Sequence, residues 1–253
     1  MNLQILFIKD LKEIVKTYRI YVIPAVFLFF GFSSPIIAYF LPELIDSMAG
    51  EIEIIMPTPT WQEAFGEYFS NLTQMGLLAV ILTFMGTVSA EKNSGIIQMI
   101  LAKPVSRYSF VFSKLFANCL LLIVSVFISY WACFYSTIIL FPEVNLNSTL
   151  LASVIFLVYA LFIASLTIAA SAVTRSNILA GGIALGGFVI SSILPVLHPF
   201  LAEYSPGALQ QNLEMVIAGS ITFSDLIFPV LITLLLSTLL VYLGAFILNR
   251  QEL

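Results

Sequence analysis

The sequence has 253 residues, of which 60% are hydrophobic and only 9% are charged. A soluble domain is roughly a quarter charged, and the mean hydropathy of +1.05 also departs from that class. The composition therefore excludes soluble domains and indicates an all-α polytopic membrane protein. The net charge of −4 matters less than where the charges lie along the chain.

Residues 3–19 show two faces at helical spacing. The apolar side holds Phe7, Leu11, Ile14, Val15 and Tyr18, and the other side is mostly basic. This pattern predicts an amphipathic helix in the membrane interface, with its basic face toward anionic headgroups. The alternative is the charged start of a signal peptide. The next apolar run is long for that purpose, however, and no small-x-small cleavage site ends it.

Six apolar runs are long enough to cross about 30 Å of hydrocarbon as helices. They are 20–41, 72–88, 115–141, 150–173, 178–197 and 226–248. With the helix at 1–19 they make residues 1–253 a single transmembrane domain. The segment 198–225 is a long, semi-apolar loop, which we expect to form short helices that rest on the membrane surface or re-enter it.

The basic residues indicate the orientation. All ten Lys and Arg residues lie within 1–19, 89–114, 174–177 and 249–253. Six membrane spans place these four segments on the same side of the membrane. Basic loops stay in the cytoplasm. Both termini are therefore predicted to be cytoplasmic. The expected location is the plasma membrane of a prokaryote.

The fifth span contains Gly182 and Gly186 in a GxxxG spacing. Small residues at this spacing allow two helices to approach closely. Two interpretations stay open: the pair packs within the chain, or it lies at a gate or a dimer seam with a second chain.

The sequence lacks the groups that catalysis, metal binding or ion coupling would use. It has one histidine, His198, two cysteines, Cys119 and Cys133, and no P-loop motif. The interiors of the six runs carry no Asp, Glu, Lys, Arg or His, whereas proton- and ion-coupled carriers usually place such a group at mid-membrane. We expect no catalytic, metal or cofactor site in the chain and no nucleic-acid partner. The energy for directed work would then come from a partner protein.

The segment Glu91–Arg107, EKNSGIIQMILAKPVSR, is a short charged island between the second and third spans. Its apolar residues form a stripe on a short helix, and Pro104 ends that helix because proline cannot continue the hydrogen-bond ladder. The members of the stripe are Ile96, Ile97, Ile100 and Leu101. A short helix with an apolar face and a charged rim suits a groove in a partner. The alternative is an interfacial helix that lies on lipid.

The island and its surroundings resemble the ABC-2 type permeases, the membrane halves of ATP-binding cassette exporters. The topology is similar over essentially the whole chain, and the specific motif is confined to Glu91–Lys114. The matching positions are Glu91, Gly95, Leu101, Pro104, Ser106 and Arg107, followed by Lys114 at the start of the third span. The K-P-V-S-R run is similar to the branch that includes the NosY-type permeases of copper-enzyme maturation and several peptide exporters or immunity proteins.

The resemblance implies that residues 1–19 are a connecting helix and that 89–107 hold the coupling helix, seated in an ATPase subunit. It implies two permeases, identical or related, in the lipid bilayer with two ATPase subunits that bind ATP and Mg. Since this chain has no nucleotide-binding domain, the ATPase would be a separate polypeptide. Glu91 would be an electrostatic or helix-capping anchor, the apolar stripe would dock, and Arg107 would be a rim contact.

The expected function is therefore that of a permease subunit that exports a hydrophobic or amphipathic substrate. Two other functions stay open. One is a non-transporting membrane scaffold or sensor remodelled by a partner ATPase, which would lack a continuous cavity at the dimer interface. The other is an ion-coupled carrier, which the uncharged spans and the lack of inverted repeats disfavour.

Overall fold

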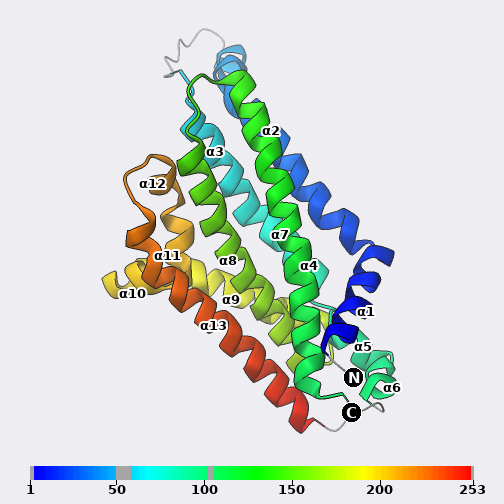
Figure 1. Ribbon diagram of the computed structural model, residues 1–253. Helices are drawn as coiled ribbons and strands as arrows, with labels where there is room; N and C mark the ends of the chain where they lie inside the picture. The colour runs from blue at the N-terminus through cyan, green and yellow to red at the C-terminus, as the bar shows by residue number, and fades with distance from the viewer. Residues whose placement is uncertain (1–2, 50–57, 102–104, 252–253) are drawn as a thin grey trace.

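The protein is a bundle of long helices, described for residues 3–49, 58–101 and 105–251 in a computed structural model (Figure 1). Within these residues the regular structure is helical and contains no strand. Six helical segments are long and apolar enough to cross a membrane: Arg19–Ile45, Trp61–Asn93, Arg107–Leu140, Leu146–Val173, Asn177–Leu197 and Phe223–Arg250. The predicted all-α class with six membrane-spanning helices is confirmed.

The N-terminal helix α1 (Leu3–Lys16) precedes the first span, α2 (Arg19–Ala49), and packs against the start of α7 (Arg107–Leu140). Its buried stripe is Leu6, Asp10 and Ile14. Of the predicted apolar face, Ile14 is buried, and Phe7 and Leu11 pack partly against the core. Val15 and Tyr18 are exposed, so the contact of this helix with lipid stays a prediction.

The second span is one long helix with a wider turn inside it. It consists of α3 (Trp61–Asn71), the π-helical turn η1 (Leu72–Gly76) and α4 (Leu77–Phe84). A capping box starts it, in which Glu63 N donates to Thr60 Oγ1 and Thr60 N donates to Glu63 Oε2, at 3.4 and 2.9 Å.

This helix begins well before residue 72, where the hydropathy pattern placed the start of the span. Polar residues such as Gln62 and Glu67 lower the local hydropathy, but they lie on one exposed face. The opposite face is apolar and buried, with Phe65 and Phe69 in the core. The connection between the first and second spans is correspondingly shorter than the predicted bounds 20–41 and 72–88 imply.

Buried tyrosines tie the central helices together. The Tyr68 hydroxyl donates to Ser129 Oγ at 3.0 Å, and Ser129 Oγ donates to the carbonyl of Phe27 at 2.6 Å. The hydroxyl of Tyr159 on α8 (Leu146–Val173) shares a hydrogen bond of 2.9 Å with Ser191 on α9 (Asn177–Leu197). Because an unpaired polar group is costly in an apolar interior, these pairs fix the register of the helices.

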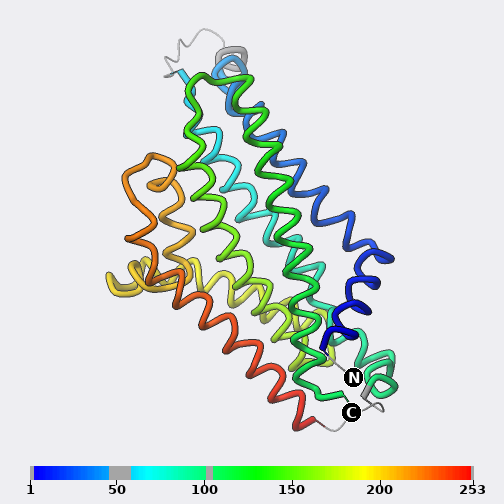
Figure 2. The backbone as a smooth tube through the Cα atoms, in the orientation of Figure 1, coloured from blue at the N-terminus to red at the C-terminus, as the bar shows by residue number. Residues whose placement is uncertain are grey.

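Between α9 and the last span, the chain forms three short helices, α10 (Pro199–Tyr204), α11 (Pro206–Gln211) and α12 (Leu213–Ile217). Figure 2 shows the chain rising through α11 and α12 and then returning into α13 (Phe223–Arg250). Gly207 lets α11 approach α9, since a Cβ at this position would lie 1.9 Å from the carbonyl oxygen of Ser191.

The basic segments of the chain gather at one end of the bundle. Figure 1 places α1, α5 (Ser89–Asn93), α6 (Ile96–Leu101) and the C-terminal end of α13 together there, with both termini. The loops at 58–60 and 141–145 lie at the opposite end.

Candidate partner-docking site and the charged cluster beside it

The candidate docking site is a helical corner formed by α5 and α6. Gly95 joins the two helices with a φ of +70°, a left-handed conformation that favours glycine. Its amide donates to the carbonyl of Lys92 at 3.2 Å, which ends α5, and its carbonyl accepts from Gln98 N at 3.2 Å, inside the first turn of α6. Gly95 therefore sets the direction in which α6 leaves the second span.

The two sides of α6 have different surroundings. Ile97 is 1% exposed and belongs to the hydrophobic core, and Ile100 packs partly against that core. Ile96 and Met99 are 44% and 76% exposed. The predicted stripe is therefore divided: Ile97 faces the protein because α6 folds back on the bundle, and the exposed apolar pair is Ile96 and Met99. Met99 was missed, although its i, i+3 spacing from Ile96 could have indicated it.

Two predicted positions of the island fall at the edge of the described residues. Leu101 is the last residue of α6, and its side chain is not among the described ones. Pro104 lies outside the described residues. After this gap, Ser106 caps α7 by accepting from Ser109 N at 3.1 Å.

Arg107, predicted to be a rim contact, has partners within the chain. Its Nη1 donates to the carbonyls of Leu248, Asn249 and Gln251 at 2.7, 3.2 and 2.8 Å. These carbonyls belong to the C-terminal end of α13, where unpaired acceptors and the helix dipole favour a cation. The guanidinium group thus binds the last span to the first residue of α7.

Lys92 binds backbone carbonyls at the C-terminal end of α8 in a similar way. Its Nζ donates to the carbonyls of Ala172 and Thr174, the latter at 3.1 Å, and to Gln251 Oε1 at 2.9 Å. Gln251 Nε2 also donates to the carbonyl of Val173 at 2.8 Å. The ends of α8 and α13 are therefore held to the α5–α6 corner.

Glu91 points away from α6, into a cluster of charged side chains. Its Oε1 lies 2.7 Å from Lys114 Nζ and 3.1 Å from Lys9 Nζ. Of the two anchoring modes expected for Glu91, the structure shows ion pairs rather than a helix cap. We call this group the charged cluster; its members are Lys9, Asp10, Glu13, Glu91 and Lys114.

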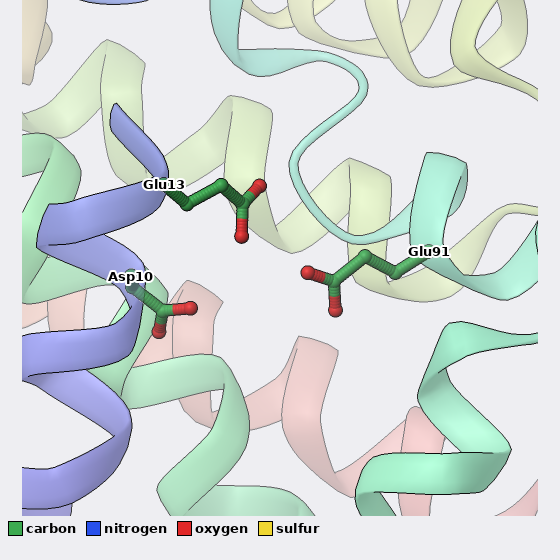
Figure 3. Close-up of side chains that lie close together, drawn as sticks. All are labelled: Asp10, Glu13 and Glu91. Atoms are coloured by element: carbon green, nitrogen blue, oxygen red, sulfur yellow. The ribbon is translucent and has the colours of Figure 1, made fainter. Parts of the chain in front are cut away.

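The charged cluster joins three segments that are far apart in sequence. Figure 3 shows Asp10 and Glu13 on α1 directed toward Glu91 on α5. Asp10 Oδ1 lies 3.6 Å from Lys114 Nζ, and Asp10 Oδ2 accepts a hydrogen bond from Ser113 Oγ. Lys114 is 1% exposed and Asp10 is 4% exposed. Charges this deeply buried are tolerated only when they are paired.

The three carboxylates of the cluster have oxygens within 4.8 Å of one another, a spacing that could hold a metal ion. Two ammonium groups already supply the positive charge there: Lys9 Nζ lies 3.2 Å from Asp10 Oδ1 and 3.5 Å from Glu13 Oε2, in addition to the Lys114 contacts. The donor set therefore fits an ion-pair network better than a metal site.

Lys9 is the half-buried member at the mouth of the cluster. Burial alone would lower its pKa, but the carboxylates of Glu91, Asp10 and Glu13 outweigh this effect and raise the pKa above 10.5. Because the pKa of Lys9 is raised in the folded state, its ion pairs stabilise the fold at neutral pH. This stabilisation is lost only as the pH rises through the raised pKa.

Sequence reasoning placed Lys114 in the motif but did not find its partners. Asp10 and Lys9 were read as part of an interfacial helix, since their pairing depends on how α1 lies against α7. One signal was available: Leu6, Asp10 and Ile14 share one helical face at i, i+4 spacing, and a carboxylate between two apolar residues indicates a buried partner.

The GxxxG pair of the fifth span lies on the outer surface of α9. A Cβ added at Gly182 or Gly186 would meet no atom of the described chain within 4 Å, whereas Gly181 and Gly187 face Met85 and Leu166. The first of the two open interpretations, packing within the chain, therefore does not hold for Gly182 and Gly186. Their face is available to lipid or to a second chain.

Six apolar helices with a compact helical corner at one end define a multi-pass membrane protein. The chain belongs to the ABC-2 family of transporter proteins, whose family model matches residues 4–253. The uncharacterized transmembrane protein YxlG of Bacillus subtilis (strain 168) is 23% identical over 212 residues, which cover 83% of this chain and 82% of that protein. The resemblance carried by the Glu91–Lys114 motif is confirmed at the level of the family, whose members are membrane components of transporters.

Proposed function

We propose that the chain is the permease subunit of an ABC-2 exporter, driven by a separate ATPase subunit that binds ATP and Mg. The observation that carries the proposal is the exposed apolar pair Ile96 and Met99 on α6, in a chain of the ABC-2 family. Exposed apolar side chains beside charged ones suit a groove in a partner. The basic segments share the end that carries α6, which supports a cytoplasmic position for this end and for both termini.

The buried side of α6 supports a mechanical role. Ile97 anchors α6 in the core, and Glu91 links the same corner to α1 and α7 through Lys9 and Lys114. A force that an ATPase applies to α6 would therefore reach three segments of the bundle at once. Closure of two ATPase subunits on ATP would then rock two permeases and move a hydrophobic or amphipathic substrate outward.

The second permease would pack against α9. Gly182 and Gly186 form an open, small-residue face on this helix, and small residues drive close helix association in membranes because no hydrophobic force acts between helices in lipid. The complex would contain two permeases, identical or related, and two ATPase subunits.

The test is a pull-down of the tagged chain in mild detergent, scored for a co-purifying protein that binds ATP. Ile96→Asp and Met99→Asp place a charge in the docking surface without entering the core, so both should release the ATPase. Val15→Asp on α1 is the matched control, since Val15 is also exposed and apolar, at 58%. This variant should retain the partner.

Recovery of the chain without an ATP-binding partner would contradict the permease proposal. Retention of the ATPase by both α6 variants would place the docking surface elsewhere. A partner that hydrolyses ATP while vesicles containing the complex move no substrate would favour the scaffold or sensor.

A further inference from the structure

A groove lies between the second span and the short helices after α9. Figure 1 places α3, α11 and α12, which form it, in the half of the bundle away from the termini. The groove consists of two adjoining cavities of about 260 and 430 Å³, which share Gly66, Ser70, Glu214 and Ile217 in their walls. We call it the outer groove. Helix α3 and the turn η1 form one wall, and α11 and α12 form the other.

The α3 wall is a polar stripe on a membrane-spanning helix. Glu63, Glu67, Ser70 and Gln74 recur at i, i+4, i+7 and i+11 and are all exposed. At about 1.5 Å per residue the stripe is roughly 16 Å long. Polar side chains on a span are costly against lipid and usually face water or a pathway. The stripe therefore indicates a hydrated surface rather than a lipid-facing one.

Thr73, in the π-helical turn, supplies an independent sign of a ligand. It is 3% exposed and lines the outer groove, yet its Oγ1 has no hydrogen-bond partner within the described residues. Several other buried threonines donate to the carbonyl one turn earlier, as Thr167 and Thr233 do at 2.7 and 2.6 Å. A buried hydroxyl without a partner needs an explanation, and π-helical turns are frequent at functional sites.

The charge of the groove selects the ligand. Its walls carry three carboxylates, Glu63, Glu67 and Glu214, and no Lys, Arg or His. Glu63 and Glu67 each accept a hydrogen bond from their own helix segment. The Glu214 carboxylate has no hydrogen bond or ion pair within the part of the chain that the structure describes, so it can receive a cation. Phe69, Leu213 and Ile217 also line the groove but are themselves buried, so the accessible side chains of the walls are mainly polar.

We propose that the outer groove binds an organic cation that carries ammonium groups on an aliphatic chain. The ammonium groups pair with Glu214 and Glu67, one N–H donates to Thr73 Oγ1, and the aliphatic part links the ammonium groups along the groove. That this cation is the cargo rests on the proposed transport function; its binding does not. Lysine-rich peptides and polyamines share this chemistry, and both belong in the test.

The experiment is calorimetric titration of the purified chain in lipid nanodiscs with spermidine, with trilysine amide and with triglutamate. The expected result is saturable binding of one or both cations and none of triglutamate. Thr73→Val should weaken cation binding about tenfold, since a hydrogen bond to a charged group is lost. Glu67→Gln combined with Glu214→Gln should weaken it further. Glu143→Gln, a carboxylate at the same end outside the groove, should leave the affinity unchanged.

Absence of saturable binding by the wild type would overturn the inference, as would an equal loss in the Glu143 variant or equal affinity for triglutamate. Binding of spermidine alone assigns the groove to polyamines, and binding of trilysine amide alone assigns it to peptides. The pull-down of the ATPase in mild detergent is performed in parallel on the wild type and the same variants. A chain that retains its ATPase but binds neither cation refutes the groove and leaves the permease proposal intact.

Discussion

The ammonium nitrogen of Lys114 lies 2.7 Å from Oε1 of Glu91, and the two residues are only 1% and 7% exposed. This pair joins the start of α7 to the corner that carries α6. Lys9 reaches the same carboxylate oxygen from α1 at 3.1 Å. One oxygen thus holds together the N-terminal helix, the second span and the third span, directly beside the proposed docking surface.

Lys114→Met should destabilise the fold strongly, because it leaves Asp10 and Glu91 buried with only one cation near them. Removing one partner of a buried ion pair costs about 3–5 kcal/mol. The measurement is the midpoint of thermal unfolding of the purified chain in detergent or nanodiscs. Lys16→Met, at an exposed lysine of α1, should leave the midpoint unchanged.

Exchange of the two charges provides the sharper test of the pair. Glu91→Lys alone should be as damaging as Lys114→Met, whereas Glu91→Lys with Lys114→Glu should recover part of the loss. If the double variant is no more stable than the single ones, the pair is not the source of the stabilisation.

Arg107→Gln should loosen the C-terminal end of α13. Its guanidinium donates to three carbonyls there, and hydrogen bonds to charged groups contribute about 1.5–3 kcal/mol each. Amide hydrogen exchange over 245–251 should become faster, with little change over 150–170. Arg107→Lys keeps the charge but not the planar fork, so its exchange rates should lie between those of the wild type and Arg107→Gln. Unchanged protection in Arg107→Gln would show that these contacts do not hold the helix.

Substitutions on the exposed face of α9 test the assembly of two chains independently of the folding of one chain. Gly186→Leu meets open space in the single chain, so its folding should be preserved, but a second chain packed on this face would be displaced. Chemical cross-linking in membranes should then show fewer dimers. Gly207→Ala is the opposite case, because its Cβ would overlap the backbone of α9; it should reduce the folded yield. Normal dimer levels in Gly186→Leu would move the seam to another helix.

The fold class was predictable because membrane spans depend on composition over about 20 residues, a signal that single substitutions do not hide. The start of the second span was not, because its first turns are amphipathic. Hydropathy averages both faces of a helix, so Glu63 and Glu67 concealed the buried Phe65 and Phe69 behind them. The capping box at Thr60 and Glu63 was the local signal for the true start.

The site was predictable as a segment but not as a set of contacts. The motif located Glu91 and Arg107, yet Glu91 pairs with α1, and Arg107 binds the end of α13, more than a hundred residues further along the chain. Such partners depend on the tertiary arrangement, which periodicity does not contain. The same holds for Ile97, since an i, i+1, i+4 stripe does not tell which part of the apolar arc meets the bundle.

Gly95→Ala tests whether the direction of α6 matters for coupling. The φ of +70° costs a residue with a Cβ about 1–2 kcal/mol, although space is open around the position. The strain would favour a different exit of α6 and move Ile96 and Met99 from their present positions. Gly95→Asn is the matched control, because asparagine adopts this conformation more readily. In reconstituted complexes, substrate-stimulated ATP hydrolysis should fall in Gly95→Ala and be largely retained in Gly95→Asn, while the unfolding midpoints of the two variants stay close. Equal loss in both variants would mean that the glycine serves close packing against the partner rather than the turn.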